Sequence, residues 1–202
     1  MGRRAAARPP SVETAVRRRE ERKTVRRLRR GRRDAYEEII CGHYEAIYRF
    51  FAYLTLDAGL AEELTQETFA AAWANIESFR HRCRLGTWLH RIAYRKFIDA
   101  QRSLKREALL KDRLKQHVRD KLDSDASDPF HRVAADEDSR QLYEAMLRLD
   151  SSEYMVIVLH YIEGLSLRET AVVMDEPVGT VKWKMSRALK RLREYLTDRV
   201  KR

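Results

Sequence analysis

Basic and aromatic side chains cluster together in two segments of this sequence. Residues 79–96 combine Phe79, His81 and Trp88 with several arginines, and residues 180–191 combine Trp183 with a series of lysines and arginines. Guanidinium and ammonium groups neutralise phosphates, and aromatic faces stack on unpaired bases. This mixture, found twice, indicates a protein that binds nucleic acid.

Charge is segregated along the chain in blocks of alternating sign. The net charge is +11, and residues 1–33 alone hold 14 basic and 3 acidic groups, which also gives +11. The later blocks carry −8 (34–79), +10 (80–119), −7 (120–165) and +5 (166–202). Such segregation is typical of a protein that offers one face to a polyanion and another to a basic partner.

Motifs for catalysis and for metal binding are missing from the sequence. It contains no HExxH, no glycine-rich phosphate loop and no GxSxG, and Cys41 and Cys83 form no CxxC pair. We therefore expect no enzyme activity, no catalytic residue, no cofactor and no metal, with both cysteines as structural thiols. No apolar stretch approaches the ~18 residues that span a bilayer, so we expect a cytoplasmic protein without membrane insertion.

Helical periodicity dominates the rest of the chain and predicts an all-α fold. Apolar residues recur at steps of three or four over 34–54, over 60–76 after a break at Asp57–Gly59, and over 87–104 after a loop at 78–86. A second series covers 142–162, where Gly164 is placed as a cap. Ser166 and Glu169 form a capping box, and a turn at 175–177 leads to a final helix over 178–196. The last two helices predict a helix-turn-helix.

Composition divides the chain into four parts. We expect a basic disordered arm at 1–33, a small helical domain at 34–106, a flexible linker at 107–138 and a helix-turn-helix domain at 139–202. The arm has almost no periodic apolar content, and a short helix on DNA or RNA, carried by Val12, Val16, Val25 and Leu28, is the less favoured alternative. The linker contains the acidic, turn-forming run 123–129.

Three blocks of residues resemble the sigma-70 family of RNA polymerase sigma factors. They are Ala61–Phe69 followed by Trp73, Thr87–Ala93 followed by Asp99, and Pro177–Lys182 followed by Ser186–Ala188. The order and spacing are similar to regions 2 and 4 of the extracytoplasmic-function group, which lacks region 3. The resemblance covers about 34–104 and 139–196. It implies a region 2 helical bundle for the core polymerase and the −10 element, and a region 4 domain for the −35 element.

The resemblance also implies partners and site residues. Core RNA polymerase would be bound through its beta-prime coiled coil and beta flap, promoter DNA would be a second partner, and an anti-sigma factor a third. The residues implied to bind core polymerase are Glu62, Glu63, Leu64, Gln66, Glu67 and Phe69, although Leu64 and Phe69 also fit a role in the core.

The residues implied to contact DNA form two sets. Those for the −10 element are His81, Arg82, Trp88, Arg91, Tyr94, Arg95 and Lys96, although a core role is favoured for Trp88. Those for the −35 element are Arg168, Thr180, Lys182, Trp183, Lys184, Ser186, Arg187 and Lys190. Lys182, Trp183 and Arg187 are expected nearest the bases, whereas Lys190 also fits an ordinary solvated face.

Three residues depart from the family pattern: Gly86, Arg95 and Trp183. They leave the architecture unchanged and put the promoter sequence and the mode of strand capture in doubt. Two other functions stay open at this point, a stand-alone helix-turn-helix regulator and an RNA-binding protein. The acidic block at Glu62–Glu67 favours a sigma factor, because a simple regulator has no need of it. A sigma factor would act in the cytoplasm, at the nucleoid.

Overall fold

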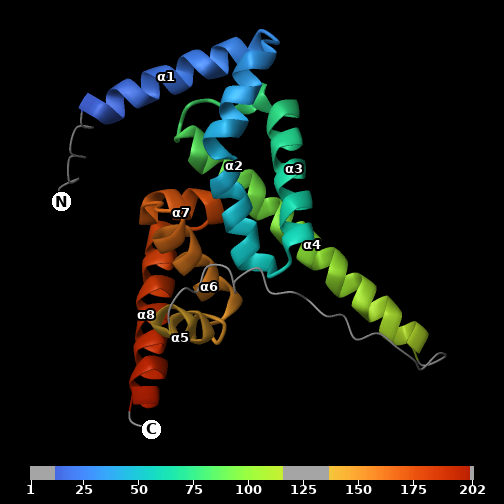
Figure 1. Cartoon of the computed structure of the whole chain (residues 1–202), viewed down its shortest axis with the longest axis vertical. Coiled ribbons are helices and arrows are strands. Elements are labelled where there is room, and N and C mark those ends of the chain that lie inside the picture. The colour runs from blue at the N-terminus through green and yellow to red at the C-terminus, as the bar shows by residue number, and fades with distance from the viewer. Residues whose placement is uncertain (1–11, 116–136, 201–202) are drawn as a thin grey trace.

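The protein is seen in a computed structural model that describes residues 12–115 and 137–200, with side chains at 16, 18–103 and 141–197. Every regular element in these ranges is a helix, which confirms the predicted all-α class. The helices form a first unit, α1–α4, and a second unit, α5–α8 (Figure 1).

The first unit is built on three helices that cover one another's apolar faces. They are α2 (Arg33–Thr55), α3 (Ala58–Ala74) and α4 (Leu85–Lys115), joined by the short η1 (Ile76–Ser78). Leu56 ends α2 in the left-handed region at φ 57°, and the carboxylate of Asp57 then accepts a hydrogen bond from the Leu60 amide at 3.0 Å. This N-cap reverses the chain, so that Phe50, Phe51 and Leu89 meet in a closed core.

The N-terminal segment is helical, and the prediction of a disordered arm over 1–33 is wrong for its described part. Residues Val12–Arg29 form α1, and Figure 1 shows it lying across the end of α2. Val25 and Leu28 are buried against the first unit, and Thr24 donates a hydrogen bond to Glu38 at 2.7 Å. Two apolar anchors and one buried hydroxyl therefore fix a helix whose other side chains are mostly charged. Residues 1–11 lie outside the described part.

The predicted linker at 107–138 is partly helical. The helix α4 continues to Lys115, well past the boundary expected at 106, and residues 116–136 lie outside the described part. The first unit therefore ends in a long helical extension (Figure 1).

The second unit consists of α5 (Glu137–Met146), α6 (Ser151–Ile157), the π-helical turn η3 (Val158–Ile162), α7 (Leu167–Met174) and α8 (Val178–Val200). Ser166 and Glu169 form the expected capping box, and Gly164 has φ 66° just after η3. Asp175 ends α7 in the left-handed region at φ 58°, and α8 begins three residues later. The predicted helix-turn-helix is thus formed by α7 and α8.

The two units pack against each other rather than standing apart. The helix α7 lies on α4, and η3 lies on α2. The Tyr154 hydroxyl, in α6, donates a hydrogen bond to the Tyr53 carbonyl at 2.6 Å. This closed arrangement determines which of the expected DNA-contacting side chains are accessible.

Candidate nucleic-acid interface

The outward face of α8 is the most accessible of the expected DNA-contacting surfaces. Trp183 is 57% exposed, Lys182, Ser186 and Lys190 are exposed, and Thr180 is half-buried near the helix start. Arg168 is exposed in the first turn of α7. An exposed helix of this length, preceded by a short capped helix, has the shape that enters a major groove.

Two members of the expected −35 set are held by carboxylates of their own unit. The Lys184 ammonium lies 2.6 Å from Glu176 and is mostly buried. Arg187 contacts Asp150 at 3.0 Å and Glu153 at 2.7 Å, and its guanidinium lies 5.2 Å from the centre of the Trp183 ring. Lys184 and Arg187 therefore brace the helix-turn-helix, and Arg187 also fixes the orientation of Trp183.

A buried carboxylate explains why α8 is held so firmly on α6. The Glu153 side chain is 2% exposed and accepts a hydrogen bond from Arg191 at 2.9 Å, in addition to its contact with Arg187. It also completes a capping box with Asp150 at the start of α6. Removing a partner from such a set leaves a buried charge unpaired, so this cluster stabilises the packing of α8 on α6.

A groove on the first unit brings together part of the expected −10 set. It has a volume of about 270 Å³ and lies where α3 and η1 meet α4. Trp88 and Ile92 give it an apolar wall, and Arg95 and Lys96 line its basic side. Lys96 is also paired with Glu67 at 2.8 Å. Apolar surface beside cationic groups is the combination that an unstacked base and its phosphate require. The half-buried Trp88 also packs on Phe79, with ring centres 5.2 Å apart, so it contributes to both the core and the groove.

The loop before α4 presents His81 and Arg82. His81 has a positive φ of 55° and packs edge-on against buried Phe79. Burial of the ring, aided by the charges of Arg29 and Arg22, lowers the pKa of His81 below 6.5. The neutral imidazole has one donor and one acceptor nitrogen, which suits a base edge better than a phosphate. Arg82 is exposed beside it.

The remaining members of the −10 set face the second unit. Arg91 contacts Asp175, the residue that ends α7, at 3.0 Å. Tyr94 lines an interdomain groove with Val173 and Asp175, and burial raises its pKa. The structure thus divides the expected −10 residues between an open groove, an exposed loop and a covered strip of α4.

A fully buried carboxylate anchors this closed arrangement. The Glu163 side chain, at the end of η3, is 0% exposed and accepts two hydrogen bonds from Arg49 at 3.0 Å each. It also lies 3.3 Å from His90 Nε2 on α4. A second carboxylate, Glu169, accepts a hydrogen bond from Thr87 at 3.2 Å and lies 3.7 Å from Arg84. Acidic groups of the second unit therefore neutralise basic groups of the first.

The acidic face of α3 contains the polar residues expected to bind core polymerase. Glu62, Glu63, Gln66 and Glu67 are exposed along one side of the helix. The assignment of Leu64 and Phe69 to this surface is wrong, because they are only 4% and 3% exposed and lie in the core. Phe69 packs on Tyr44 with ring centres 6.2 Å apart.

Several residues of the interface were not identified from the sequence. Asn75 and Ser78 line the groove beside Trp88, and Glu163 and Glu153 hold the units and α8 in place. Asn75, Ser78 and Phe79 follow α3 within five residues, and this polar and aromatic segment could have indicated the first pair from the sequence. Glu163 had none, since its partners are 114 and 73 residues away in the sequence.

The departures from the family pattern are accommodated without strain. Arg95 is exposed at the groove, and a Cβ at Gly86 would meet His43 at an ordinary contact distance of 3.5 Å. Among the residues with described side chains, no group of three or more metal-binding side chains is found. Over the same part of the chain, no helix has the length and apolar character needed to cross a membrane.

Family models match both units. The model for Sigma-70 region 2 matches residues 39–107, and the model for Sigma-70 region 4 matches residues 139–192. The first match begins within α2, so α1 lies outside it.

Individual relatives agree with these matches. The chain is 31% identical over 180 residues to the ECF RNA polymerase sigma factor SigW of Bacillus subtilis (strain 168), covering 87% of this chain and 96% of that protein. It is 30% identical to the ECF RNA polymerase sigma factor SigM of the same organism, and the match covers 78% of this chain and 92% of that protein. A solved structure of the sigma factor RpoE in complex with the anti-sigma factor NepR from Bartonella quintana is similar, with a TM-score of 0.63 and 25% identity, covering 80% of this chain and 96% of that one.

Proposed function

This chain belongs to the sigma-70 family of RNA polymerase sigma factors, in the extracytoplasmic-function group, and from that premise we propose which surfaces carry out promoter recognition. As a sigma factor it binds core RNA polymerase and directs transcription initiation at promoters. A stand-alone helix-turn-helix regulator is not favoured, because a region 2 accompanies the helix-turn-helix. Sigma factors are regulators, and we propose that the chain has no catalytic activity or cofactor of its own.

Core polymerase binds the acidic face of α3. Glu62, Glu63 and Gln66 are exposed in a row on a helix whose apolar side is fully used by the core, so the face is available to a basic partner. We assign it to the beta-prime coiled coil and assign the second unit to the beta flap. Charge complementarity of this kind steers association and selects the partner.

The −10 element is captured on the first unit and the −35 element on the second. Trp88, Arg95 and Lys96 in the groove accept unstacked bases and their backbone, with His81 and Arg82 beside them. Lys182, Trp183 and Ser186 enter the major groove, while Arg168 and Lys190 contact phosphates. The observation that supports this division best is the exposure of Trp183 and Lys182 on a helix braced from behind by Glu153.

The closed arrangement of the free chain opens when the promoter is engaged. Arg91 is paired with Asp175 across the interdomain contact, so it reaches DNA only after α7 leaves α4. The similar RpoE structure contains an anti-sigma factor, and we propose a partner of that class that favours the closed form. The chain would then act in the cytoplasm, at the nucleoid.

The test of the assignment is a charge reversal on α3. Glu62→Lys combined with Glu63→Lys should abolish binding to core polymerase, because two repulsive contacts replace two attractive ones, and leave the helical circular dichroism unchanged. Glu67 is left intact because it pairs with Lys96. Glu37→Lys with Glu45→Lys alters two exposed acids of α2, outside both surfaces assigned to the polymerase, and is the matched control. Undiminished binding by the α3 variant would refute the assignment.

A further inference from the structure

The exposed side of α1 carries arginines that have no acidic partner among the described side chains. Arg18, Arg22 and Arg26 follow one another at steps of four, so they lie close together along one side of the helix. All three are exposed, and none takes part in an ion pair within the part of the chain whose side chains are described. By contrast, Lys23 and Arg27 are paired with Glu20, Asp34 and Glu38.

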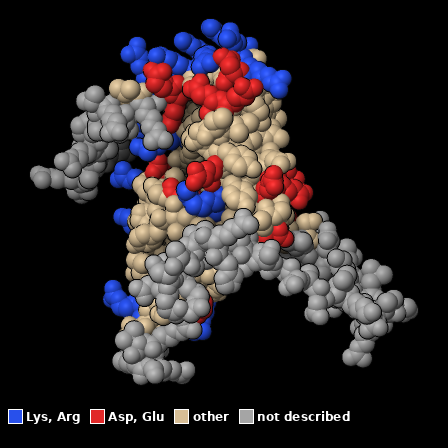
Figure 2. All heavy atoms as spheres, viewed as in Figure 1, with Lys and Arg blue, Asp and Glu red and all other residues tan. Residues whose placement is uncertain are grey.

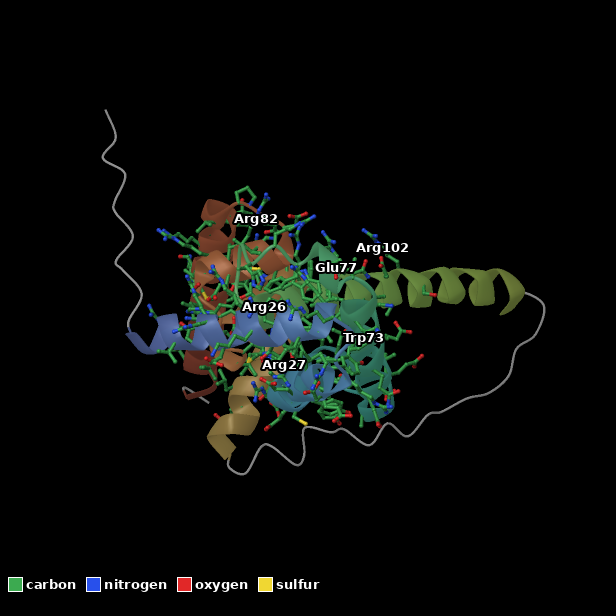
Figure 3. All side chains as sticks on the ribbon, turned by 90° about the horizontal axis from the view of Figure 1, so that it is seen from above. Arg26, Arg27, Trp73, Glu77, Arg82 and Arg102 are labelled. Carbon is green, nitrogen blue, oxygen red and sulfur yellow. The ribbon has the colours of Figure 1, made fainter. Side chains whose placement is uncertain are left out.

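This arginine stripe (Arg18, Arg22 and Arg26) adjoins the loop assigned to the −10 element. Arg18 and Arg22 line a small hollow together with His81, Arg82 and Cys83. Glu21 also borders it, but its carboxylate accepts a hydrogen bond from the Leu85 amide at 3.5 Å. Figure 3 shows Arg26 on the side of α1 nearer Arg82, and Arg27 on the opposite side.

The helix is fixed to the first unit firmly enough to act as part of the same surface. The Arg29 guanidinium donates hydrogen bonds to the carbonyls of Ile76, the first residue of η1, and Phe79, the residue that follows η1. Val25 and Leu28 are buried beneath. Figure 2 shows Lys and Arg side chains gathered at the end of the molecule where α1 meets α2. The stripe therefore has a set position relative to His81 and Arg82.

We propose that α1 is an additional DNA-binding element that grips backbone phosphates of the promoter next to the −10 element. The inference rests on the proposed function of the neighbouring loop. Eight residues of α-helix advance about 12 Å, and phosphates of one strand follow at about 3.4 Å along the duplex axis. The stripe can therefore face several consecutive phosphates. The three arginines form no ion pair within the described side chains, and binding of a polyanion would relieve the repulsion between them.

The experiment measures promoter binding by the complete holoenzyme as a function of salt. The variant is Arg18→Gln with Arg22→Gln. Its control is Lys23→Gln with Arg33→Gln, which removes the same charge from residues that are each paired with a neighbouring acid. Loss of two phosphate contacts should make the negative slope of log affinity against log salt shallower by about 1.8. Between 50 and 200 mM salt, the wild type should then lose about tenfold more affinity than the variant.

Further measurements separate this inference from the proposed function. The variant should keep full affinity for core polymerase and the same preference for an intact over a scrambled −10 element. A promoter fragment cut next to the −10 element on the side that α1 contacts should remove the difference between variant and control. Equal slopes for variant and control would overturn the proposal while leaving the sigma function intact, and so would weaker core binding by the variant. Failure of the wild type to bind core would instead refute the proposed function.

Discussion

The outward faces of α4 and α8 carry similar side chains but differ in what covers them. Trp183 and Lys182 of α8 stand free, with their supporting ion pairs behind them. On α4, Arg91 is bound by Asp175 and the adjoining surface is closed by α7. The proposed DNA-contacting face of region 4 is thus exposed in the free chain, and that of region 2 is partly covered by region 4. We therefore expect the contact between the units to control promoter binding while both domains remain folded.

Removing the buried carboxylate between the units should have the largest effect on the cover over α4. Glu163→Ala leaves Arg49 and His90 without their partner, and we expect a loss of about 2–3 kcal/mol in the packing of the units. This is below the figure for a wholly buried pair because Arg49 is 41% exposed. Small-angle X-ray scattering should show a larger radius of gyration, and Glu194→Ala should leave it unchanged. An unaltered radius for Glu163→Ala would contradict the anchoring role.

The support behind α8 gives the next largest expected effect. Glu153→Gln removes the charge that holds Arg187 and Arg191, and we expect a loss of about 2 kcal/mol in the stability of the second unit. Thermal unfolding followed by circular dichroism measures it. Trp183→Ala is the comparison, since the exposed ring should matter for promoter binding and little for unfolding. Equal unfolding of the two variants would mean that Trp183 belongs to the scaffold.

Two lysines on different sides of α8, Lys182 and Lys184, are two residues or about half a helical turn apart. Lys182→Ala should weaken binding to promoters with an intact −35 element by about 1–3 kcal/mol, because the exposed ammonium is free to reach a base edge. Lys184→Ala should leave −35 preference unaltered, because Lys184 is held by Glu176. Competition between intact and scrambled −35 sequences provides the measurement. A loss of preference in Lys184→Ala that matches Lys182→Ala would reverse the assignment.

The smallest predicted effect is a dependence on pH at the start of α7. Hydrogen bonds from Ser166 and the nearby Arg84 charge outweigh burial and lower the pKa of Glu169 below 4.5. A lowered carboxyl pKa means that the stabilisation is complete above pH 4.5 and is lost as the pH falls through the lower value. Glu169→Gln keeps a capping side chain but cannot titrate. Its melting temperature should therefore fall less than that of the wild type on acidification, and parallel curves would contradict this.

Local features of the sequence were sufficient to predict most helices. The Ser166–Glu169 box, the break at Asp57 and the apolar periodicity of α2 act within a few residues, and the structure confirms each. They did not favour α1 over a disordered arm, because only Val25 and Leu28 interrupt its charged residues as buried anchors. An arginine-rich segment is typical of disorder when its stabilising contacts are not visible nearby. The carbonyls that accept hydrogen bonds from Arg29 are 47 and 50 residues away in the sequence.

The sequence predicted which residue types make up the candidate site, but not which of those side chains are exposed. Leu64 and Phe69 lie in the same segment as the acidic residues of α3, and the sequence alone did not settle which of them face the core. In the sequence, Lys184 and Arg187 cannot be distinguished from the other basic residues of α8. Only the structure shows that Glu176 pairs with Lys184 and Glu153 with Arg187. Ion pairs between distant segments therefore decide which basic residues remain for DNA.

The separation of the two units on promoter binding tests the central claim most directly. Spin labels at Ala74→Cys in α3 and Thr197→Cys in α8, two exposed positions outside the assigned DNA contacts, report the distance between the units by electron–electron double resonance once Cys41 and Cys83 are replaced by serine. We predict one narrow distribution for the free chain and a longer distance in the holoenzyme bound to promoter DNA. The same distribution in both states would contradict the account, because Arg91 would stay covered while the promoter is read.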